Sequence, residues 1–306
     1  MIEDRSGIDR IALVLLLAGI AAILLPIVIA VVVASQSYEA FLRAGGISLM
    51  PGASLLANLT HIIRDTPLPR QVLNSLIIAL IVAAVKCGFA FLATFALVFF
   101  DSRWSRIVFA LTLATVMLPL DLIVVTTYQV VANVAMPLNA LLETTGLGAL
   151  LSGAGGGVPH LEWNLLDSYA GIAAPLAVSS TSVFIYRQFF LGLPRDLPRA
   201  AAMDGAGPLR FLTDILLPLS KTPLIATFIF WFIGGWNAYL WPLVAATSAD
   251  RQPAIVGLSR LASTDLDQIP DVPMMMAGAL FVSFLPVLLI GLMQGRIVKG
   301  LTLAEK

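Results

Sequence analysis

The sequence has few charged residues and almost no cysteine. Only 12% of its 306 residues are charged, about half of the roughly 25% found in soluble domains. The formal net charge is zero at pH 7, so the chain has no excess of positive charge with which to bind nucleic acid. Cys87 is the only cysteine, and no disulfide can therefore form within the chain. These shortages exclude a disulfide scaffold and a nucleic-acid partner.

Residues that bind metals or carry out catalysis are also scarce. The two histidines, His61 and His160, lie far apart, and no cluster of cysteines or carboxylates accompanies either at ligand spacing. A membrane-embedded enzyme would need clustered acid, base or metal groups near one interface, and the scattered acids offer none. None of the four lysines follows a glycine, so the chain has no Gly-Lys phosphate loop. We predict no catalytic residue and no metal site.

Long apolar runs are the dominant feature of the chain. Hydrophobic residues make up 59% of the sequence, and the mean hydropathy is +0.94. A helix needs about 20 residues to cross the hydrocarbon core, and backbone groups in lipid must find partners within their own segment, which favours helices. The first run is too long for the signal-peptide core of about 7 to 15 residues. We predict an all-α membrane protein with six transmembrane helices, at about 11–34, 72–99, 107–131, 169–186, 223–244 and 274–293.

The distribution of lysine and arginine predicts the orientation of these helices. Cytoplasmic loops of membrane proteins carry an excess of positive residues. With the N-terminus inside, 12 of the 18 Lys and Arg residues fall in cytoplasmic segments, five fall in outer loops, and Lys86 lies within a span. Both termini, and the polar loop between the fourth and fifth spans, are therefore predicted to be cytoplasmic.

One stretch, 136–163, fits this pattern poorly. It is partly apolar, but Glu143 and a glycine-rich run at 153–157 interrupt it. A seventh crossing here would reverse the charge distribution. We interpret the stretch as a periplasmic insertion with a short helix near the membrane surface, and keep a re-entrant segment as the alternative.

The loop at about 192–222 is the most informative part of the sequence. Three alanines at 200–202 favour a helix, and they leave little bulk between that helix and a partner. Gly205 and Gly207 permit a sharp change of backbone direction. Pro208 can open a second helix, because the first turn of a helix does not use its N–H. The pattern predicts two short helices joined by a turn.

The second of these helices is predicted to be amphipathic. Phe211, Ile215 and Leu219 are spaced to share one face of a helix, while Arg210 and Asp214 point away. The prolines that follow end the helix and turn the chain back into the membrane. An ordinary amphipathic loop helix between two spans would show the same spacing.

The loop resembles the cytoplasmic EAA loop of permease subunits of bacterial ABC importers. It reads Ala-Ala-x-x-Asp-Gly-Ala, followed ten residues after the glycine by Ile-x-Leu-Pro. In that family the loop forms short helices that sit in a cleft of the ATP-binding subunit. The resemblance implies an ATPase-coupling role for Arg199, Ala200, Ala201, Asp204, Gly205, Ala206, Phe211, Ile215, Leu217 and Pro218.

The loop also departs from the family at one position. The glutamate that usually precedes the two alanines is replaced by Arg199. In the family this acid is expected to contribute a charged contact to the ATPase. Either Asp196 or a reversed charge on the partner would have to compensate here.

Four further stretches, 166–171, 187–190, 217–222 and 235–243, resemble the sugar-type permeases. Within these they are most similar to the branch of sn-glycerol-3-phosphate importers. The resemblance implies the transmembrane domain of a type I ABC importer. Its parts would be an N-terminal span with a periplasmic loop (1–70), the transporter core (71–295) and a cytoplasmic tail (296–306).

The same resemblance implies a set of partners in the bacterial inner membrane. The chain would pair with a second, homologous permease subunit, with a dimer of ATP-binding subunits, and with a periplasmic or lipid-anchored substrate-binding protein. ATP and Mg would be bound by the ATPase, so this transport subunit would hold no cofactor and would not be an enzyme itself. The implied solute is sn-glycerol 3-phosphate or a related glycerophosphodiester, and a neutral sugar or oligosaccharide is the alternative.

Two charged residues, Lys86 and Asp121, lie inside predicted spans. An unpaired charge at mid-bilayer costs at least about 2.5 to 3.5 kcal/mol. One interpretation is a structural ion pair between neighbouring helices. The other is that Lys86 faces the translocation pathway and favours an anionic solute.

A polar and aromatic group at the outer end of the fifth span has two interpretations. Trp236, Tyr239 and Trp241 are typical of the aromatic belt at a membrane interface. Asn237 fits lipid poorly and should face protein or water. We predict that Asn237, Tyr239 and Trp241 are candidates for the substrate pathway.

An ion-coupled secondary transporter is the alternative of another class. Such proteins show inverted halves and helices that are interrupted near mid-membrane. The sequence has no internal repeat, and no interruption is predicted within the spans.

Overall fold

The computed structural model describes residues 6–100, 103–115, 123–145, 160–261 and 269–303. The chain divides into two compact units. Unit 1 comprises Met1–Arg70 and Gly257–Leu285, and unit 2 comprises Gln71–Val256 and Pro286–Lys306. Every regular element in the described ranges is helical, as the apolar runs predict.

Unit 1 begins with a long apolar helix, α1 (Ser6–Ala34), followed by α2 (Tyr38–Arg43) and α3 (Leu55–Asp65). The last carbonyl groups of a helix have no partner within it. The Asn58 side chain on α3 donates a hydrogen bond to the Ala34 carbonyl at 2.9 Å. This bond attaches the amphipathic α3 to the end of α1.

The C-terminal part of unit 1 contains the end of α16 (Ala254–Leu261) and the start of α17 (Val272–Leu303). A Cβ atom on Gly278 of α17 would lie 3.0 Å from the Leu258 side chain of α16. A small residue at this position therefore lets the two helices approach closely.

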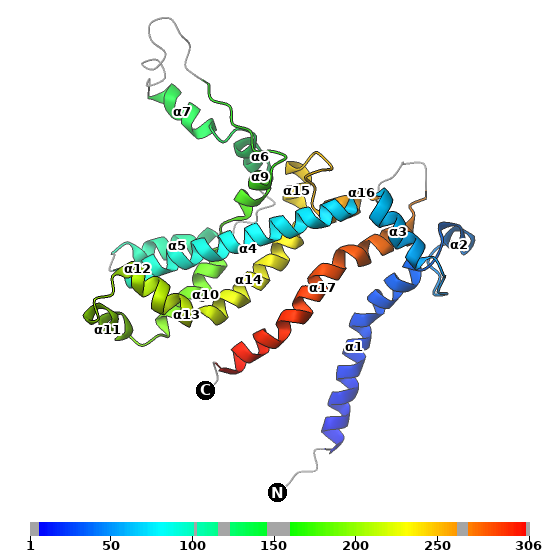
Figure 1. Cartoon of the computed structure of the whole chain (residues 1–306), viewed down its shortest axis with the longest axis horizontal. Helices are drawn as coiled ribbons and strands as arrows, with labels where there is room; N and C mark the ends of the chain where they lie inside the picture. The colour runs from blue at the N-terminus through cyan, green and yellow to red at the C-terminus, as the bar shows by residue number, and fades with distance from the viewer. Residues whose placement is uncertain (1–5, 101–102, 116–122, 146–159, 262–268, 304–306) are drawn as a thin grey trace, which may run out of the picture. The chain divides into compact units, whose positions relative to one another are not determined.

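Unit 2 holds most of the remaining helices (Figure 1). They begin with the 32-residue α4, which is apolar along almost its whole length. In chain order they are α4 (Leu68–Phe99), α5 (Ser105–Ala114), α6 (Val124–Ala132), α7 (Met136–Thr144), α9 (Tyr169–Ala173), η3 (Ala174–Leu176), α10 (Ser180–Leu191), α11 (Leu197–Met203), α12 (Pro208–Arg210), the π-helical η4 (Phe211–Leu216), α13 (Leu217–Leu219), α14 (Lys221–Trp236) and α15 (Leu240–Ala245).

Among the described residues, three helices are long and apolar enough to cross a membrane. They are Arg10–Ala34, Leu68–Phe99 and Val272–Leu292. Two bent pairs raise the number to five if each pair is one span: Tyr169–Leu176 with Ser180–Leu191, bent by 54°, and Pro208–Leu219 with Lys221–Trp236, bent by 75°. The predicted third span is covered at its ends by α5 and α6, and 116–122 lies outside the described residues. A total of six spans stays a prediction.

The expectation of an unbroken helix over 169–186 is wrong. The helix ends after Leu176, and a new helix begins at Ser180. Pro175 lies in the 3-10 turn between them, where its ring lacks the N–H that a continuing helix would use. Ser179 caps α10, and its hydroxyl accepts a hydrogen bond from the Ser182 N–H at 3.2 Å. The break therefore has a defined local cause.

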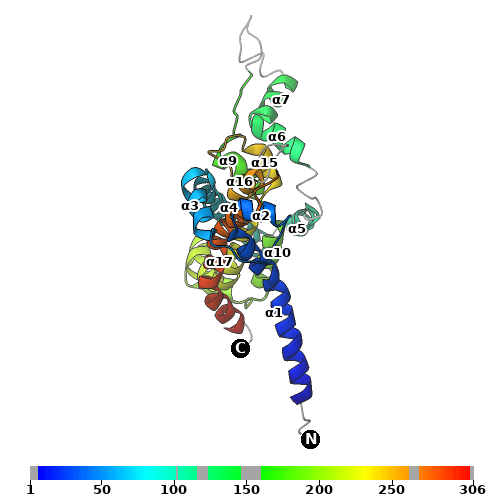
Figure 2. The same ribbon diagram turned by 90° about the vertical axis from the view of Figure 1, so that its right-hand side faces the viewer.

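The insertion does contain a short helix, α7, as predicted. Figure 2 shows α6 and α7 following one another along the chain. The returning chain is bound by two asparagines. Asn139 accepts from the Leu161 N–H at 3.0 Å and donates to the Leu161 carbonyl at 2.8 Å, and Asn133 accepts from the Trp163 N–H at 3.1 Å. The location of α7 at the membrane surface stays a prediction, and 146–159 lies outside the described residues.

A buried polar network holds α4, α9 and the loop before α16 together. Asn74 of α4 is 1% exposed; its side-chain N–H groups donate to the Gln252 carbonyl at 3.0 Å and to the Asp250 carbonyl at 2.9 Å, and its oxygen accepts from the Tyr169 hydroxyl at 2.7 Å. A Cβ atom on Gly235 of α14 would lie 3.0 Å from the α4 backbone. Close packing and satisfied polar groups thus fix α14 and α9 on α4.

Candidate functional site

The polar loop of unit 2 has the predicted turn. Gly205 follows α11 with φ of +76°, a conformation that side chains with a Cβ rarely adopt. The Ala206 N–H donates to the Ala201 carbonyl at 2.9 Å, and the Gly205 N–H donates to the Ala202 carbonyl at 3.1 Å. These bonds and the left-handed glycine form a helix C-cap. Gly207 has φ of −69°, so only Gly205 needs to be glycine for its backbone.

The predicted apolar face of the second helix holds at Phe211 and Ile215 and is wrong at Leu219. Residues Phe211–Leu216 form a π-helix, whose hydrogen bonds join residues five apart and not four apart as in an α-helix, so that its turn is wider. Phe211, Leu212 and Leu216 are buried, whereas Leu219 is 48% exposed. The wider turn brings Leu216 onto the buried face, Ile215 stays half-buried against the same cluster, and Leu219 leaves it.

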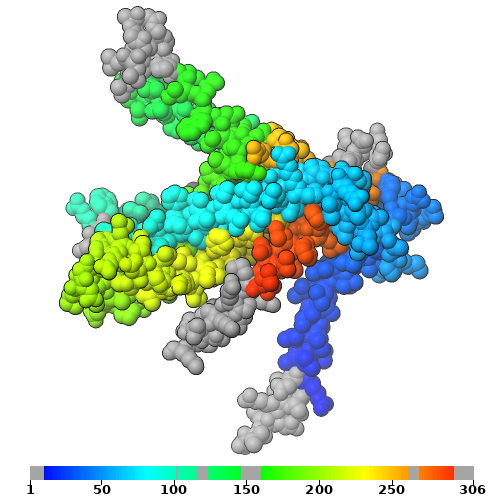
Figure 3. All heavy atoms as spheres, viewed as in Figure 1, coloured from blue at the N-terminus to red at the C-terminus, as the bar shows by residue number. Residues whose placement is uncertain are grey.

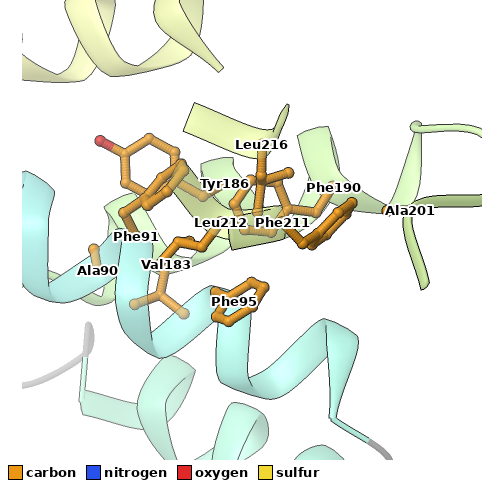
Figure 4. Close-up of a cluster of buried hydrophobic side chains, with 10 residues drawn as sticks. All are labelled: Ala90, Phe91, Phe95, Val183, Tyr186, Phe190, Ala201, Phe211, Leu212 and Leu216. Carbon is orange, nitrogen blue, oxygen red and sulfur yellow. The ribbon is translucent and has the colours of Figure 1, made fainter. Parts of the chain in front are cut away.

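Aromatic side chains attach this loop to α4 and α10 (Figure 4). The Phe91 and Phe190 rings meet edge to face at 5.3 Å between centroids, and Phe99 and Phe211 do so at 5.2 Å. Pairs of this kind contribute about 0.5 to 1.5 kcal/mol beyond their buried area. Ala201 of α11 lies in the same cluster, so the loop and the helices form one packed body.

The opposite side of the loop is exposed and partly apolar. Met203 and Leu209, on either side of the Gly205 turn, are 84% and 76% exposed. Figure 3 shows the atoms of this loop (yellow-green) at the surface, beside α4 (cyan). These two side chains give the exposed side of the loop an apolar part beside its charged residues. The sequence analysis missed both residues, because neither belongs to the motif.

The ten predicted coupling residues divide between these two sides. Two are buried and two are half-buried, and the other six are available to a partner. The buried residues are Ala201 and Phe211, the half-buried ones Ala206 and Ile215, and the exposed ones Arg199, Ala200, Asp204, Gly205, Leu217 and Pro218.

Two exposed ion pairs lie on the loop. The Arg199 guanidinium lies 3.7 Å from the Asp196 carboxylate, and Arg210 lies 3.4 Å from Asp214. Arg210 and Asp214 thus point away from the buried face, as predicted. Pairs exposed to this degree contribute little stability, so their charges remain available to a partner surface.

A cavity of about 880 Å³ lies within unit 2. Lys86 lines it and is only 8% exposed. The Lys86 Nζ lies 3.7 Å above the centre of the Trp231 ring, a cation–π contact. The Trp231 Nε1–H donates to the Ser182 hydroxyl at 2.5 Å. Asp121, the predicted partner of Lys86, lies outside the described residues, so their pairing stays a prediction.

The other pathway candidates do not line this cavity. Trp241 is 4% exposed, and its indole N–H donates to the Ile172 carbonyl at 3.1 Å. Asn237 and Tyr239 are exposed in the break between α14 and α15. The structure thus brings Lys86 to Trp231 and leaves the aromatic group elsewhere.

Asp167 is a polar residue whose role the sequence analysis did not single out. It is the only non-glycine residue with positive φ (55°) in the described ranges. Its carboxylate accepts hydrogen bonds from the Thr247 hydroxyl at 2.5 Å and from the Ser248 N–H at 2.9 Å. Slight burial raises its pKa, but the bonds from Ser248 and Thr247 outweigh this and lower the pKa below the ordinary value. The bonds hold the loop after α15 on the start of α9.

Several helices that are apolar and long enough to cross a membrane define a multi-pass membrane protein, and a polar loop packs on helices of unit 2. Residues 87–302 match the family model described as "Binding-protein-dependent transport system inner membrane component", and the chain belongs to this family. It is therefore a transport subunit of the bacterial inner membrane and not an enzyme.

Curated relatives match the chain over its whole length. The sn-glycerol-3-phosphate transport system permease protein UgpE of Yersinia pestis bv. Antiqua (strain Antiqua) is 35% identical over 312 residues, covering 100% of both chains. The proteins of the same name from Salmonella typhimurium and Escherichia coli O157:H7 are 35% and 34% identical, again with 100% coverage of both chains.

A solved structure shares the fold. It is described as a bacterial ABC transporter involved in the import of the acidic polysaccharide alginate, and the match has a TM-score of 0.70 with 19% identity. It covers 97% of this chain and 98% of the other. The fold is thus that of an ABC importer permease.

Proposed function

We propose that the chain forms half of the translocation pathway of an ATP-driven, binding-protein-dependent importer of sn-glycerol 3-phosphate or a related glycerophosphodiester. The choice of solute is supported by the 35% identity, over the full length of both chains, to permeases of that transport system. The finer architecture belongs to the proposal: six spans, both termini in the cytoplasm, and the type I importer core at 71–295.

The loop supports the coupling half of this proposal. One side of it is packed onto α4 and α10 through Phe211 and Leu216. The other side presents Met203 and Leu209 to a partner. A dimer of ATPase subunits, which binds ATP and Mg, holds this exposed side. When the ATPases close, the packed side carries the displacement into α4 and α10, because close-packed interiors transmit strain.

The remaining partners follow from the family. A second, homologous permease completes the pathway, and a substrate-binding protein outside the membrane delivers the solute. Arg199 lies near Asp196 and stands where the family has an acid, so the ATPase cleft is expected to present an acidic residue to it. The alternative of another class is an ion-coupled transporter. The match of this chain to a family of binding-protein-dependent transport components argues against it.

The direct test is uptake by the reconstituted complex. The chain is purified with its partner permease and ATPase, placed in liposomes, and supplied with the substrate-binding protein. We expect ATP-dependent accumulation of sn-glycerol 3-phosphate, competed by glycerophosphocholine and not by maltose. Accumulation of maltose alone would contradict the proposed solute. Accumulation driven by an ion gradient without ATP would contradict the proposed ATP-driven mechanism.

A further inference from the structure

The break between η3 and α10 places a helix N-terminus at the cavity. Ser179, Ser180 and Thr181 are the N-cap and the first two residues of α10, and all three line the cavity. The N–H groups of Ser180 and Thr181 have no hydrogen-bond partner among the described residues. The 12-residue α10 therefore presents free N–H donors and the positive end of its dipole to the cavity.

A buried cation lines the same cavity. The Lys86 ammonium carries three N–H donors; within the described part of the chain it forms no hydrogen bond and no salt bridge, and its contact is with the face of Trp231. Trp231 also connects the two features, since its indole N–H bonds Ser182 in the first turn of α10. A charge that is more than nine-tenths buried is costly without an anion. Lys86 and the α10 N-terminus thus give the cavity two independent sources of positive potential.

We propose that the cavity binds the phosphate group of the solute, between the Lys86 ammonium and the free N–H groups of α10. Phosphate at a helix N-terminus is a recurring arrangement. The hydroxyls of Thr115 and Ser180, 2.6 Å apart in the wall, suit the polyol part of a phosphate ester. The volume of about 880 Å³ lies within the range of about 300 to 1,000 Å³ typical of small-molecule sites. This inference rests on the proposed function, because the solute must reach the cavity.

The first test measures anion binding without transport. The purified, nucleotide-free complex is titrated with inorganic phosphate and with sn-glycerol 3-phosphate at constant ionic strength, and the rise in Tm gives the half-saturating concentration. We expect Lys86→Met to raise that concentration about 10- to 100-fold, the usual effect of losing a hydrogen bond to a charged group. Lys86→Arg should stay within about threefold of wild type.

A matched pair of variants tests the helix N-terminus. Ser180 is the first residue of α10, a position that accepts proline, and the preceding Ser179 has the extended backbone (φ −146°, ψ 102°) that a following proline requires. Ser180→Pro removes both the hydroxyl and the free N–H, whereas Ser180→Ala removes only the hydroxyl. We expect Ser180→Pro to bind phosphate about 3- to 10-fold more weakly than Ser180→Ala.

The control variant removes a similar contact outside the cavity. Arg251 lies over the Tyr169 ring at 4.8 Å and does not line the cavity, so Arg251→Met should bind phosphate like wild type. Equal shifts in wild type and Lys86→Met would overturn the proposal. Equal phosphate binding by Ser180→Pro and Ser180→Ala would show that the N-terminus of α10 does not contribute to the site.

A final comparison separates the possible sources of the phosphate. In nanodiscs of phosphatidylcholine alone, the Lys86-dependent shift should persist and should compete with sn-glycerol 3-phosphate. If phosphatidylglycerol abolishes the shift and sn-glycerol 3-phosphate does not compete, a lipid headgroup occupies the site and the solute role is overturned. If wild type binds phosphate through Lys86 but imports no sn-glycerol 3-phosphate, the solute named under the proposed function is wrong. The cavity would still be an anion-binding site.

Discussion

Two regions of unit 2 each have a buried apolar cluster, but they differ in the contacts that accompany it. Around the polar loop, aromatic rings such as Phe91, Phe190 and Phe211 pack on one another. Around α9 and α15, an apolar cluster that contains Ile172 and Trp241 is joined by hydrogen bonds from side chains to the backbone: Trp241 bonds the Ile172 carbonyl, and Asn74 bonds two carbonyls of the loop before α16.

The difference follows from how regular the backbone is. The α9 and α15 region consists of helices of five and six residues, which leave many N–H and C=O groups without intrahelical partners. Buried groups of this kind need side-chain partners. Around the loop, the buried contacts come from the sides of α4 and α10, where backbone groups bond within their own helix. Packing alone can therefore join a loop to these helices and still leave its other side free for a partner.

The largest expected effect is on ATP-driven uptake, and it tests whether transport requires the turn of the polar loop at Gly205. Gly205→Val should reduce ATP-driven uptake at least about tenfold, because a β-branched residue at a φ of +76° is a conformational outlier. Gly205→Asn is the control, since asparagine tolerates this conformation and a Cβ there meets no atom within 4 Å. Uptake and basal ATPase activity are measured on the same proteoliposomes. Equal uptake by wild type and Gly205→Val would break the assignment; failure of Gly205→Asn as well would show that the partner leaves no room for a side chain.

The next prediction tests the register of the π-helix. Leu216 is 0% exposed and Leu219 is 48% exposed. Leu216→Ala should lower the free energy of unfolding by about 2 to 5 kcal/mol, the usual cost of emptying a leucine site in a core. Leu219→Ala should change it by less than about 1 kcal/mol. Thermal unfolding of the purified complexes checks both, and the reverse order would support the α-helical register expected from the sequence.

A substitution in the region around α9 and α15 should change the stability of the complex and not the coupling of ATP hydrolysis to uptake. Trp241→Phe keeps an aromatic ring, though a smaller one, and leaves the buried Ile172 carbonyl without its donor; the lost donor alone costs about 1 to 3 kcal/mol. We expect a lower Tm with uptake per folded complex close to wild type. Lower uptake at unchanged Tm would instead place Trp241 in the solute pathway.

The smallest effect concerns Asp167 and depends on pH. Its pKa is lowered in the folded state, so its hydrogen bonds stabilise the fold fully above the unfolded pKa of about 4. This contribution is lost as the pH falls through the lower folded pKa. The Tm difference between wild type and Asp167→Asn should be constant from pH 8 to about pH 5 and should shrink below pH 4. A difference that varies between pH 6 and 8 would contradict this origin.

Local chemistry made much of the loop predictable. The Ala200 to Ala202 helix, the Gly205 turn and the start of a second helix at Pro208 all appear where the residues predict them. Each depends on interactions within a few residues: intrinsic propensity, a left-handed glycine and a proline at the first turn. The same reasoning failed at Leu216, because whether a segment coils as an α- or a π-helix depends on what it packs against.

The cavity shows the other limit of sequence reasoning. Lys86 was identified as an unusual charge, but Trp231 lies 145 positions away and nothing local relates the two. Asn237, Tyr239 and Trp241 look alike in sequence, yet the structure buries Trp241 and leaves the other two exposed. Burial of this kind is decided by which helices meet, and a single sequence does not contain that information.

Composition and local chemistry determined the membrane class, the apolar segments and the turn of the polar loop, because hydropathy and backbone preference act over short stretches of chain. Tertiary structure alone decided that the break before α10 lines a cavity, that Trp231 lies against Lys86, and that residues 211–216 coil as a π-helix. These depend on contacts between residues far apart in sequence, whose free energies are gained only when the helices pack.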